Sequence, residues 1–354
     1  MKVLFGWELG GGQGHIHRLA ALARILEPLG IEPVFALKSY KIKGIGFPWE
    51  IVFAPSLPFS GRSESYTFAD ILETFGFGNP HLLRSHLLAW QSVISQIKPS
   101  LAIADYAPGL VLAARGVIPT VVVGDSFAVP PRVEVFPPLR LPVPHQTQNR
   151  AEQVSNTIRE VVKSDAFLGE IFCGDANFIF GIPELDPYGY LRTERDRYLS
   201  IHVTPIPRNL HKPEGPAWAY LYDDYPYRNL VLQTLKPECE FKSLTEVLSG
   251  KSMAIHHGSS TTAIACLLAG IPQLVFPQSL EHRLNAIALS GLGVAKMVST
   301  PTWENLLVAQ AETYALTPNA LLLAQRLAHW NQNFVSVFVK TCLDFLAGAS
   351  AIDA

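Results

Sequence analysis

The strongest constraint on the fold is the order of segments in the first 37 residues. Residues 3–7 are apolar, residues 10–14 form a glycine-rich turn, and apolar residues then recur near the helical period of 3.6 until Gly30. A second apolar segment follows at residues 33–37. Two strands joined through a helix in this way run parallel in one sheet, with a right-handed crossover. The same order recurs over residues 101–123, so the N-terminal half is predicted to be α/β.

The C-terminal half repeats this order of segments. We expect a strand at 253–256, a Ser/Thr-rich turn, a short helix at 261–269, a strand at 273–276 and a helix at 281–290. One long, mostly apolar helix is predicted over 319–347, and it must pack against an extensive surface. The second half is therefore predicted to be a further α/β domain.

The length of 354 residues corresponds to about two domains. A polar, proline-rich stretch at 204–216 is typical of a linker between them. We expect an N-terminal domain over 1–205, a linker at 206–216 and a C-terminal domain over 217–317. The remaining segment, 318–354, is expected to cross back to the N-terminal domain.

The composition excludes several classes of protein. Apolar residues make up 48% of the chain and charged residues 16%, which is far from the composition of a disordered chain. The 28 basic and 30 acidic residues leave a net charge of −2, and no run of Lys and Arg could follow a phosphate backbone. Nucleic acid is therefore not expected as a partner. The mean hydropathy of +0.20 favours parallel sheets that are covered on both faces.

The sequence also indicates a cellular compartment. The four cysteines form no C-x-x-C pair, which favours a reducing cytosol over a disulfide framework and predicts no zinc or other metal site. No apolar run reaches the 18 or so residues that span a membrane, and no signal peptide is recognisable. We expect a cytoplasmic protein without a transmembrane segment.

The first glycine turn places two histidines at the start of a helix. It is not a dinucleotide fingerprint, because the third glycine of G-x-G-x-x-G would fall on His15 or His17. His15 lies where open α/β sheets bind ligands, and the helix N-terminus favours a neutral imidazole that could act as a base. His17 lies on the opposite side of that helix, so one of the two can face a ligand. The alternative is that His15 is structural.

Asp105 ends a predicted strand at the same edge of the sheet as His15. A carboxylate there can orient an imidazole and stabilise its cation, and it can equally cap the helix that follows. In the second half, residues 256–262 read His-His-Gly-Ser-Ser-Thr-Thr between a strand and a helix N-terminus. This pattern is typical of a site for a diphosphate, and without a P-loop lysine it is not the site of an NTPase.

Two segments resemble a known family. The segment IHHGSSTTAIACLLAGIPQLVFPQSLEHRLNAIALSGLGVA is similar to the donor-binding signature of nucleotide-sugar glycosyltransferases of the GT-B fold. The opening GGGQGHIHRLAALARIL resembles the acceptor-side turn of the same family. The resemblance implies an α/β fold of two Rossmann-like domains whose parallel sheets face each other across a cleft. It also implies an inverting transfer without a metal or a cofactor, from a nucleoside diphosphate sugar to a small or lipid-like acceptor.

The resemblance assigns roles residue by residue. His15 matches the base that deprotonates the acceptor, and Asp105 matches its partner. Glu281 and His282 match an acidic–Gln pair that holds the hydroxyls of the donor sugar. The positions that match the pyrophosphate site are His256, Gly258, Ser259, Ser260, Thr261 and Thr262. We also assign the backbone of the first turn, Gly12, Gln13 and Gly14, to the donor.

Three departures from the family pattern concern the donor. The acidic residue that binds the ribose in the family falls on Ile264, and the Gln of the acidic–Gln pair is His282. The interval from Tyr222 to His256 is short and lacks the segment that embraces the nucleobase. An epimerase or hydrolase of nucleotide sugars and a non-catalytic binding protein therefore remain alternatives.

An aromatic-rich region over residues 46–83 is predicted to form long loops with short helices. Its rings either fill the core of the N-terminal domain or contact an apolar acceptor or a membrane surface. The proline-rich stretch that begins at Val129 is predicted to be irregular.

Overall fold

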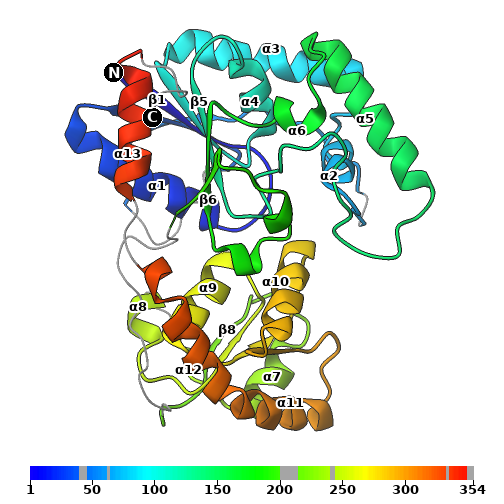
Figure 1. The fold of residues 1–354 in the computed structure, drawn as a ribbon, viewed down its shortest axis with the longest axis vertical. Helices are drawn as coiled ribbons and strands as arrows, with labels where there is room; N and C mark the ends of the chain where they lie inside the picture. Colours follow the sequence, from blue (N-terminus) through cyan, green and yellow to red (C-terminus); the bar gives the residue numbers. More distant parts are fainter. Residues whose placement is uncertain (40–45, 62–63, 200–213, 240–243, 332–334, 349–354) are drawn as a thin grey trace. The chain divides into compact units, whose positions relative to one another are not determined.

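A computed structural model describes residues 1–39, 46–61, 64–199, 214–239, 244–331 and 335–348. The described residues group by their contacts into two compact units (Figure 1). The first unit comprises Met1–Phe180, Tyr188–Tyr198 and Val335–Ala354, and the second comprises Gly181–Pro187 and Leu199–Phe334.

The first unit is built on a seven-stranded sheet with the order β3-β2-β1-β4-β5-β6-β7. Its strands are β1 (Lys2–Trp7), β2 (Glu32–Leu37), β3 (Glu50–Phe53), β4 (Leu101–Asp105), β5 (Thr120–Gly124), β6 (Ala176–Phe180) and β7 (Asp196–Leu199). From β3 to β6 every neighbouring pair is parallel. In the register Trp7 lies beside Asp105 and Asp105 lies beside Val123, so the carboxyl ends of the three central strands coincide.

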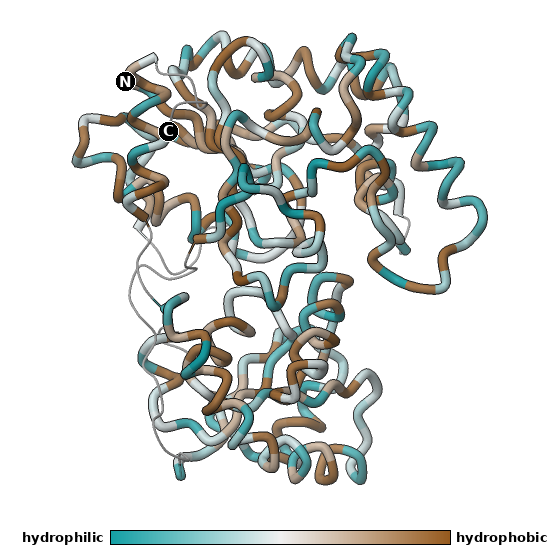
Figure 2. Tube along the Cα trace, in the orientation of Figure 1, coloured by the Kyte–Doolittle hydropathy of each residue, from teal (hydrophilic) through white to brown (hydrophobic). Residues whose placement is uncertain are grey.

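The central strands are mostly apolar, as expected where helices cover both faces of a sheet. Figure 2 colours them mostly brown, and every residue of β4 and β5 is buried. The helices are α1 (Gly14–Leu26), η1 (Glu27–Leu29), α2 (Phe68–Thr74), α3 (Pro80–Ile97), α4 (Pro108–Ala114), α5 (Gln146–Val162), α6 (Leu168–Ile171), η3 (Gly189–Leu191) and α13 (Val335–Leu346). Among these helices, α3 packs against both α4 and α5.

The second unit contains a parallel four-stranded sheet with the order β11-β10-β9-β8. Its strands are β8 (Trp218–Tyr220), β9 (Ala254–His256), β10 (Gln273–Val275) and β11 (Ala295–Met297). Ala254 and Val275 point into one apolar cluster, whereas Ile255 and Leu274 point into another. The sheet is therefore covered on both faces.

The helices of the second unit are η2 (Pro183–Leu185), α7 (Arg228–Leu235), α8 (Leu244–Val247), α9 (Ser260–Ala269), α10 (Leu280–Gly291), α11 (Trp303–Ala315), α12 (Thr317–Arg326) and η4 (Ala328–Asn331). Helix α9 is the central one, with every residue buried except Thr261. Its end at Gly270 follows from the left-handed φ of 74° at that glycine.

The C-terminal segment differs from its prediction. In place of one helix over 319–347, the structure has α12, η4 and α13, with residues 332–334 outside the described part. Helix α13 belongs to the first unit, where the ring of Phe338 lies edge-on to Phe178 at 5.4 Å. Helix α12 packs on α9 in the second unit. The continuous apolar pattern concealed this change because both halves bury an apolar face.

The other expectations on organisation have mixed outcomes. Most of the predicted linker, residues 206–213, lies outside the described residues, while 181–187 groups with the second unit, which the prediction placed in the first. The proline-rich stretch that begins at Val129 contains no helix or strand up to residue 144, as predicted. Among the described helices, none combines the length and apolar character that a membrane crossing requires.

The aromatic-rich region divides between the core and the surface. Trp49, Phe68 and Phe77 are buried, whereas the side chains of Phe53 and Phe59 are more than 60% exposed. The core interpretation therefore holds for the buried rings, whereas contact of the exposed rings with an acceptor or a membrane surface stays a prediction.

Candidate active site and nucleotide-sugar site

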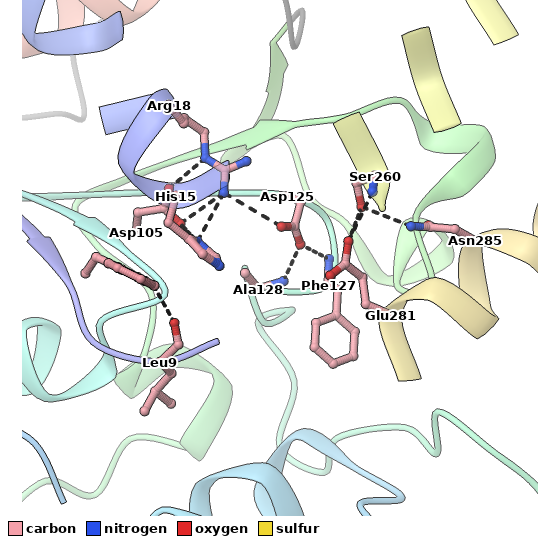
Figure 3. A network of polar contacts seen from close by, with 11 residues as sticks. Leu9, His15, Arg18, Asp105, Asp125, Phe127, Ala128, Ser260, Glu281 and Asn285 are labelled. Carbon is pink, nitrogen blue, oxygen red and sulfur yellow. Dashed lines mark hydrogen bonds and ion pairs between the residues drawn. The ribbon is translucent and has the colours of Figure 1, made fainter. Parts of the chain in front are cut away.

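In the first unit, His15 and Asp105 meet at the carboxyl edge of the sheet. His15 occupies the first turn of α1, and Asp105 ends β4. The imidazole Nδ1 lies 2.8 Å from Oδ1 of Asp105 (Figure 3). Since an ionised carboxylate only accepts hydrogen bonds, Nδ1 carries a proton, and Nε2 of a neutral His15 is left as the basic atom. The predicted dyad is therefore present as a contact.

Two aromatic rings flank the imidazole of His15. Trp7 stacks on it with the centroids 5.5 Å apart, and Tyr106 stacks with the centroids 6.0 Å apart. The indole of Trp7 is itself fixed, because its Nε1 donates a hydrogen bond to the carbonyl of Leu9. The ring of His15 is thus held in one plane by its neighbours, and 8% of the residue remains exposed.

Gly10 approaches His15 closely. Its φ is +77°, and a Cβ atom added there would lie 2.8 Å from Nε2 of His15. Only glycine fits this position without strain, which gives the first glycine of the turn a physical reason. His17 is exposed on α1, in agreement with the expectation that one of the two histidines faces the site.

The rest of the first turn is open. Gly12 and Gly14 are exposed, Gln13 is half-buried as the N-cap residue of α1, and Gly12 has a φ of +79°. Among the described residues, no atom lies within 4 Å of a Cβ atom added to Gly12 or Gly14, so neither glycine is packed against a neighbour. Their assignment to the donor stays a prediction.

Arg18 and Asp125 belong to the same cluster, although neither was singled out from the sequence. The guanidinium of Arg18 bonds Asp105 twice, from Nε to Oδ2 at 2.7 Å and from Nη2 to Oδ1 at 3.1 Å. Its Nη2 also lies 3.7 Å from Oδ2 of Asp125, which directly follows β5. The available signal for Arg18 was its spacing of three residues from His15, which places both on one face of a helix.

The carboxyl group of Asp105 has no exposure to solvent. Burial alone would raise its pKa, but the positive charge of Arg18, together with the charge and hydrogen bond of His15, holds the pKa of Asp105 below its usual value. Asp105 is therefore a carboxylate at neutral pH.

In the second unit, the predicted donor residues gather around the start of α9. Gly258 has a φ of +92°, and a Cβ atom there would lie 2.9 Å from the carbonyl oxygen of His282. This close approach brings α10 against the turn. Asn285 reinforces it, because its Nδ2 donates to the carbonyl of Gly258 at 2.8 Å and to Oγ of Ser260 at 3.1 Å.

Glu281 accepts hydrogen bonds from the backbone N–H of Ser260 at 3.1 Å and from its hydroxyl at 2.9 Å (Figure 3). A carboxylate at a helix N-terminus is stabilised by the helix dipole, as a phosphate would be. Ser259 donates its hydroxyl proton to Oγ1 of Thr262 at 3.2 Å, and Thr261 is half-buried in the same turn. The start of α9 is thus arranged as an anion site, in which the carboxylate of Glu281 already accepts the hydrogen bond of one N–H group, that of Ser260.

His256 is buried below this turn. Its Nδ1 accepts a hydrogen bond from the N–H of Gly258 at 2.9 Å, and Nε2 donates to Oε1 of Gln273 at 2.9 Å. Burial lowers the pKa of His256 to about 3, against a hydrogen bond to Gln273 that favours the charged form. Both ring nitrogens are therefore used within the unit, and His256 acts on the turn by holding Gly258.

Two further imidazoles lie beside the turn. Nδ1 of His257 donates to the carbonyl of Phe276 at 2.8 Å, and Nε2 accepts from the N–H of Tyr222 at 2.9 Å. Burial lowers the pKa of His257 and lowers the pKa of His282 to about 4. Nδ1 of His282 accepts from the N–H of Gln278 at 3.3 Å. These side chains are neutral at pH 7 and contribute no positive charge to the site.

Ile264, the position of the expected departure, is 1% exposed and belongs to the apolar core around α9. The position at which the resemblance led us to expect a ribose-binding acid is therefore taken by a core residue in this chain. Among the described residues, no three His, Cys, Asp or Glu side chains are grouped as metal ligands would be. Independence of a metal stays a prediction.

The site residues that sequence reasoning missed in the second unit are His257 and Asn285. The segment quoted above contained both, and Asn285 belongs to its Asn-Ala pair. Their roles depend on which backbone groups their side chains reach, which no spacing indicates.

Comparison with known proteins finds a short similarity in sequence and a similarity of fold over nearly the whole chain. No protein-family model matches the sequence. The elloramycin glycosyltransferase ElmGT from Streptomyces olivaceus is 37% identical over 62 residues, a segment that covers 18% of this chain and 16% of the length of ElmGT.

Solved structures match over nearly the whole chain. The calicheamicin glycosyltransferase CalG4 has a TM-score of 0.65 at 14% identity, with 98% of both chains covered. The spinosyn rhamnosyltransferase SpnG, complexed with thymidine diphosphate, has a TM-score of 0.62 at 13% identity, covering 96% of this chain and 99% of SpnG. The glycosyltransferase VinC in complex with dTDP has a TM-score of 0.60 at 15% identity, covering 99% and 100%. The expected α/β fold of the GT-B class, with a parallel sheet in each of two domains, is confirmed.

Proposed function

We propose that this chain is a glycosyltransferase that moves a sugar from a nucleoside diphosphate sugar to a hydroxyl group of an acceptor. The observation that carries the proposal is the His15–Asp105 contact of 2.8 Å at the carboxyl edge of the first sheet. That edge is where open α/β sheets bind ligands. The fold shared with CalG4, SpnG and VinC supports the same activity.

His15 is the base in this proposal. Nε2 of the neutral imidazole takes the proton of the acceptor hydroxyl as its oxygen attacks the anomeric carbon. The bond from that carbon to the diphosphate oxygen breaks, and its electron pair leaves with the nucleoside diphosphate. Attack opposite the leaving group inverts the configuration of the carbon. Asp105 stabilises the imidazolium that forms, through the hydrogen bond to Nδ1.

The start of α9 is the proposed site for the diphosphate. The first N–H groups of a helix have no partner within it, and here they belong to Ser260, Thr261 and Thr262. The helix dipole stabilises the negative charge that develops on the leaving group. A diphosphate at Ser260 takes the place that the carboxylate of Glu281 occupies, which frees Glu281 for a sugar hydroxyl. No metal and no cofactor is part of this mechanism.

The acceptor is proposed to be small or lipid-like. The exposed rings of Phe53 and Phe59 in the aromatic-rich region support an apolar acceptor. The reducing compartment indicated by four scattered cysteines supports a cytoplasmic location, and all four are free thiols in the structure.

A second candidate is a protein that binds a nucleotide sugar without transferring it. Two observations favour it: Glu281 fills one anion-binding N–H group, and Ile264 takes the place of a ribose-binding acid. Both concern the donor side, whereas the His15–Asp105 dyad concerns the acceptor. A protein that only binds a nucleotide sugar needs no base, whereas the His15–Asp105 dyad is arranged as one. Transfer is therefore the better proposal.

The test uses the whole chain with dTDP-, UDP- and GDP-sugars and a panel of phenolic, macrolide and lipid alcohols, with products followed by mass spectrometry. His15→Ala is expected to reduce transfer by at least about 100-fold, the contribution of a general base. The same variant should keep the rise in melting temperature that the nucleoside diphosphate causes. His17→Ala, on the exposed side of α1, is the matched control and should retain transfer.

Product analysis separates the alternatives. Sugar release without an acceptor indicates a hydrolase, and a changed nucleotide sugar indicates an epimerase. A rise in melting temperature with nucleotides but no turnover of any donor indicates a binding protein. Full transfer by His15→Ala contradicts the role of His15 as the base.

A further inference from the structure

Arg18 contacts the dyad from within the same helix. It lies one turn after His15 on α1, and its side chain is 10% exposed. Its guanidinium holds both oxygens of Asp105, through Nε at 2.7 Å and Nη2 at 3.1 Å. Oδ1 of Asp105 is thus shared between Arg18 and Nδ1 of His15 (Figure 3).

This two-point contact fixes the plane of a buried carboxylate. A single hydrogen bond from His15 would leave the carboxyl group of Asp105 free to rotate about its last torsion. The Arg18 contact removes this freedom and directs Oδ1 at Nδ1. It also gives Asp105 a permanent counter-charge, which a fully buried carboxylate requires when His15 is neutral.

The positive charge of Arg18 also acts on His15 directly. Nη2 lies 3.4 Å from Nδ1 of His15, so protonation of the imidazole places two cations side by side. Asp125 offsets part of this repulsion, with Oδ2 3.7 Å from Nη2. Asp125 is fixed in turn, because its Oδ1 accepts hydrogen bonds from the N–H groups of Phe127 and Ala128.

Other charged and titratable groups near His15 are engaged with partners of their own. Glu8, after β1, lies 2.6 Å from Nε2 of His86 on α3 and accepts the N–H of Gly109 at 2.7 Å. Lys38, after β2, donates to the carbonyl of Gly10 at 2.6 Å and lies over the ring of Trp7. The phenol of Tyr106 stacks on His15. None of these contacts involves Arg18, so an Arg18 variant leaves them in place.

We propose that Arg18 is a positioning residue of the transferase, which acts through Asp105 to orient His15 and which places a fixed positive charge beside its imidazole. The cluster then carries one guanidinium between the two carboxylates Asp105 and Asp125, with a net charge of −1 when His15 is neutral. Proton uptake by His15 in the reaction brings the cluster to zero. The inference rests on the proposed function, because the orientation of a base has a purpose only in a proton transfer.

The test compares three variants of the whole chain. Arg18→Met removes the charge and both hydrogen bonds at similar length, and Arg18→Lys keeps the charge but not the two-point contact. Arg24→Met is the matched control, because Arg24 lies on the same helix, is exposed, and bonds the carbonyl of Gly46. Melting curves identify any variant that does not fold.

The expected result has two parts. Arg18→Met lowers kcat by about 10- to 100-fold, since the base loses its orientation, while the KM for the donor changes by less than about twofold. The acidic limb of its pH–rate profile moves to higher pH by about one unit or more, because a cation beside the imidazole is gone. Arg18→Lys keeps the limb near that of the wild type and loses about threefold to tenfold in kcat. Arg24→Met behaves as the wild type.

A purely structural role lowers stability and kcat without moving the limb. An unmoved or lowered limb in Arg18→Met, or an equal movement in Arg24→Met, therefore overturns the proposal. The ¹⁵N NMR titration of the His15 imidazole gives the same shift without any turnover, with His15→Gln to identify the signal. The wild type could show no transfer while the NMR titration of His15 still differs between the wild type and Arg18→Met. This result would contradict the proposed function and would support the coupling between Arg18 and His15.

Discussion

The buried His256 makes the second unit sensitive to acid. Its pKa is lowered to about 3, chiefly by burial, from a value of 6.5 in an unfolded chain. Between these two values the unfolded chain binds a proton that the folded chain does not. The free energy of unfolding therefore falls as the pH decreases from 6.5 to about 3, by about 1.4 kcal/mol per unit for one proton. From pH 7 to pH 5 this single group accounts for a loss of about 2 kcal/mol.

His256→Asn separates this effect from the loss of a contact. The Asn amide oxygen can accept the N–H of Gly258, but the donor to Gln273 is lost, so a buried acceptor is left unsatisfied. We expect a cost of about 1 to 3 kcal/mol at every pH. The loss between pH 7 and pH 5 should be smaller than that of the wild type by about 2 kcal/mol. His282, with a pKa of about 4, contributes in the same direction in both proteins.

The assay is urea unfolding at pH 7 and pH 5, followed by hydrogen exchange of peptides from β9, α9 and β10, so that the second unit is measured by itself. His329→Asn, at an exposed position of the same unit, is the control and should keep the pH dependence of the wild type. An equal loss between pH 7 and pH 5 in His256→Asn and in the wild type would refute the reasoning.

Three further substitutions test the geometry. Gly10→Ala places a Cβ atom 2.8 Å from Nε2 of His15 at a φ of +77°, and we expect about 1 to 3 kcal/mol of strain in urea melts and a fall in kcat. Gly258→Ala meets the carbonyl of His282 at 2.9 Å, and it should lose the rise in melting temperature caused by nucleoside diphosphates. Phe338→Ala removes a fully buried ring that packs on Phe178, with an expected cost of about 3 to 5 kcal/mol in urea unfolding of the first unit.

The sequence predicted the parts of the fold that depend on one-dimensional patterns. Strands of a covered parallel sheet are apolar along most of their length, so β4 and β5 could be found from the sequence without knowing which strands pair with them. The contact of His15 with Asp105 followed from the rule that the carboxyl ends of parallel strands meet at one edge. The break between α12 and α13 was missed, because the apolar pattern continues although its two halves pack in different units.

The directions of side chains were beyond the sequence. Arg18 could be placed on the face of His15 by spacing, but its reach to Asp105 and Asp125 depends on how α1 lies on the sheet. His256 looked like a ligand of the diphosphate, and packing instead puts its ring below the turn with both nitrogens bonded. A histidine pattern gives the position of an imidazole, while its burial decides what the imidazole can do.

The two units differ in the groups that can stabilise a negative charge. In the first, Arg18 lies between two carboxylates, so a permanent cation is needed to keep Asp105 ionised without solvent. In the second, burial keeps the pKa values of His256, His257 and His282 low, so no imidazolium stands at the start of α9 at neutral pH. In the proposed function, the diphosphate there is held by N–H groups and hydroxyls, whose strength does not depend on pH. A chain with a net charge of −2 and no cluster of Lys and Arg can therefore still offer a diphosphate a site, because helix α9 supplies the positive end of its dipole.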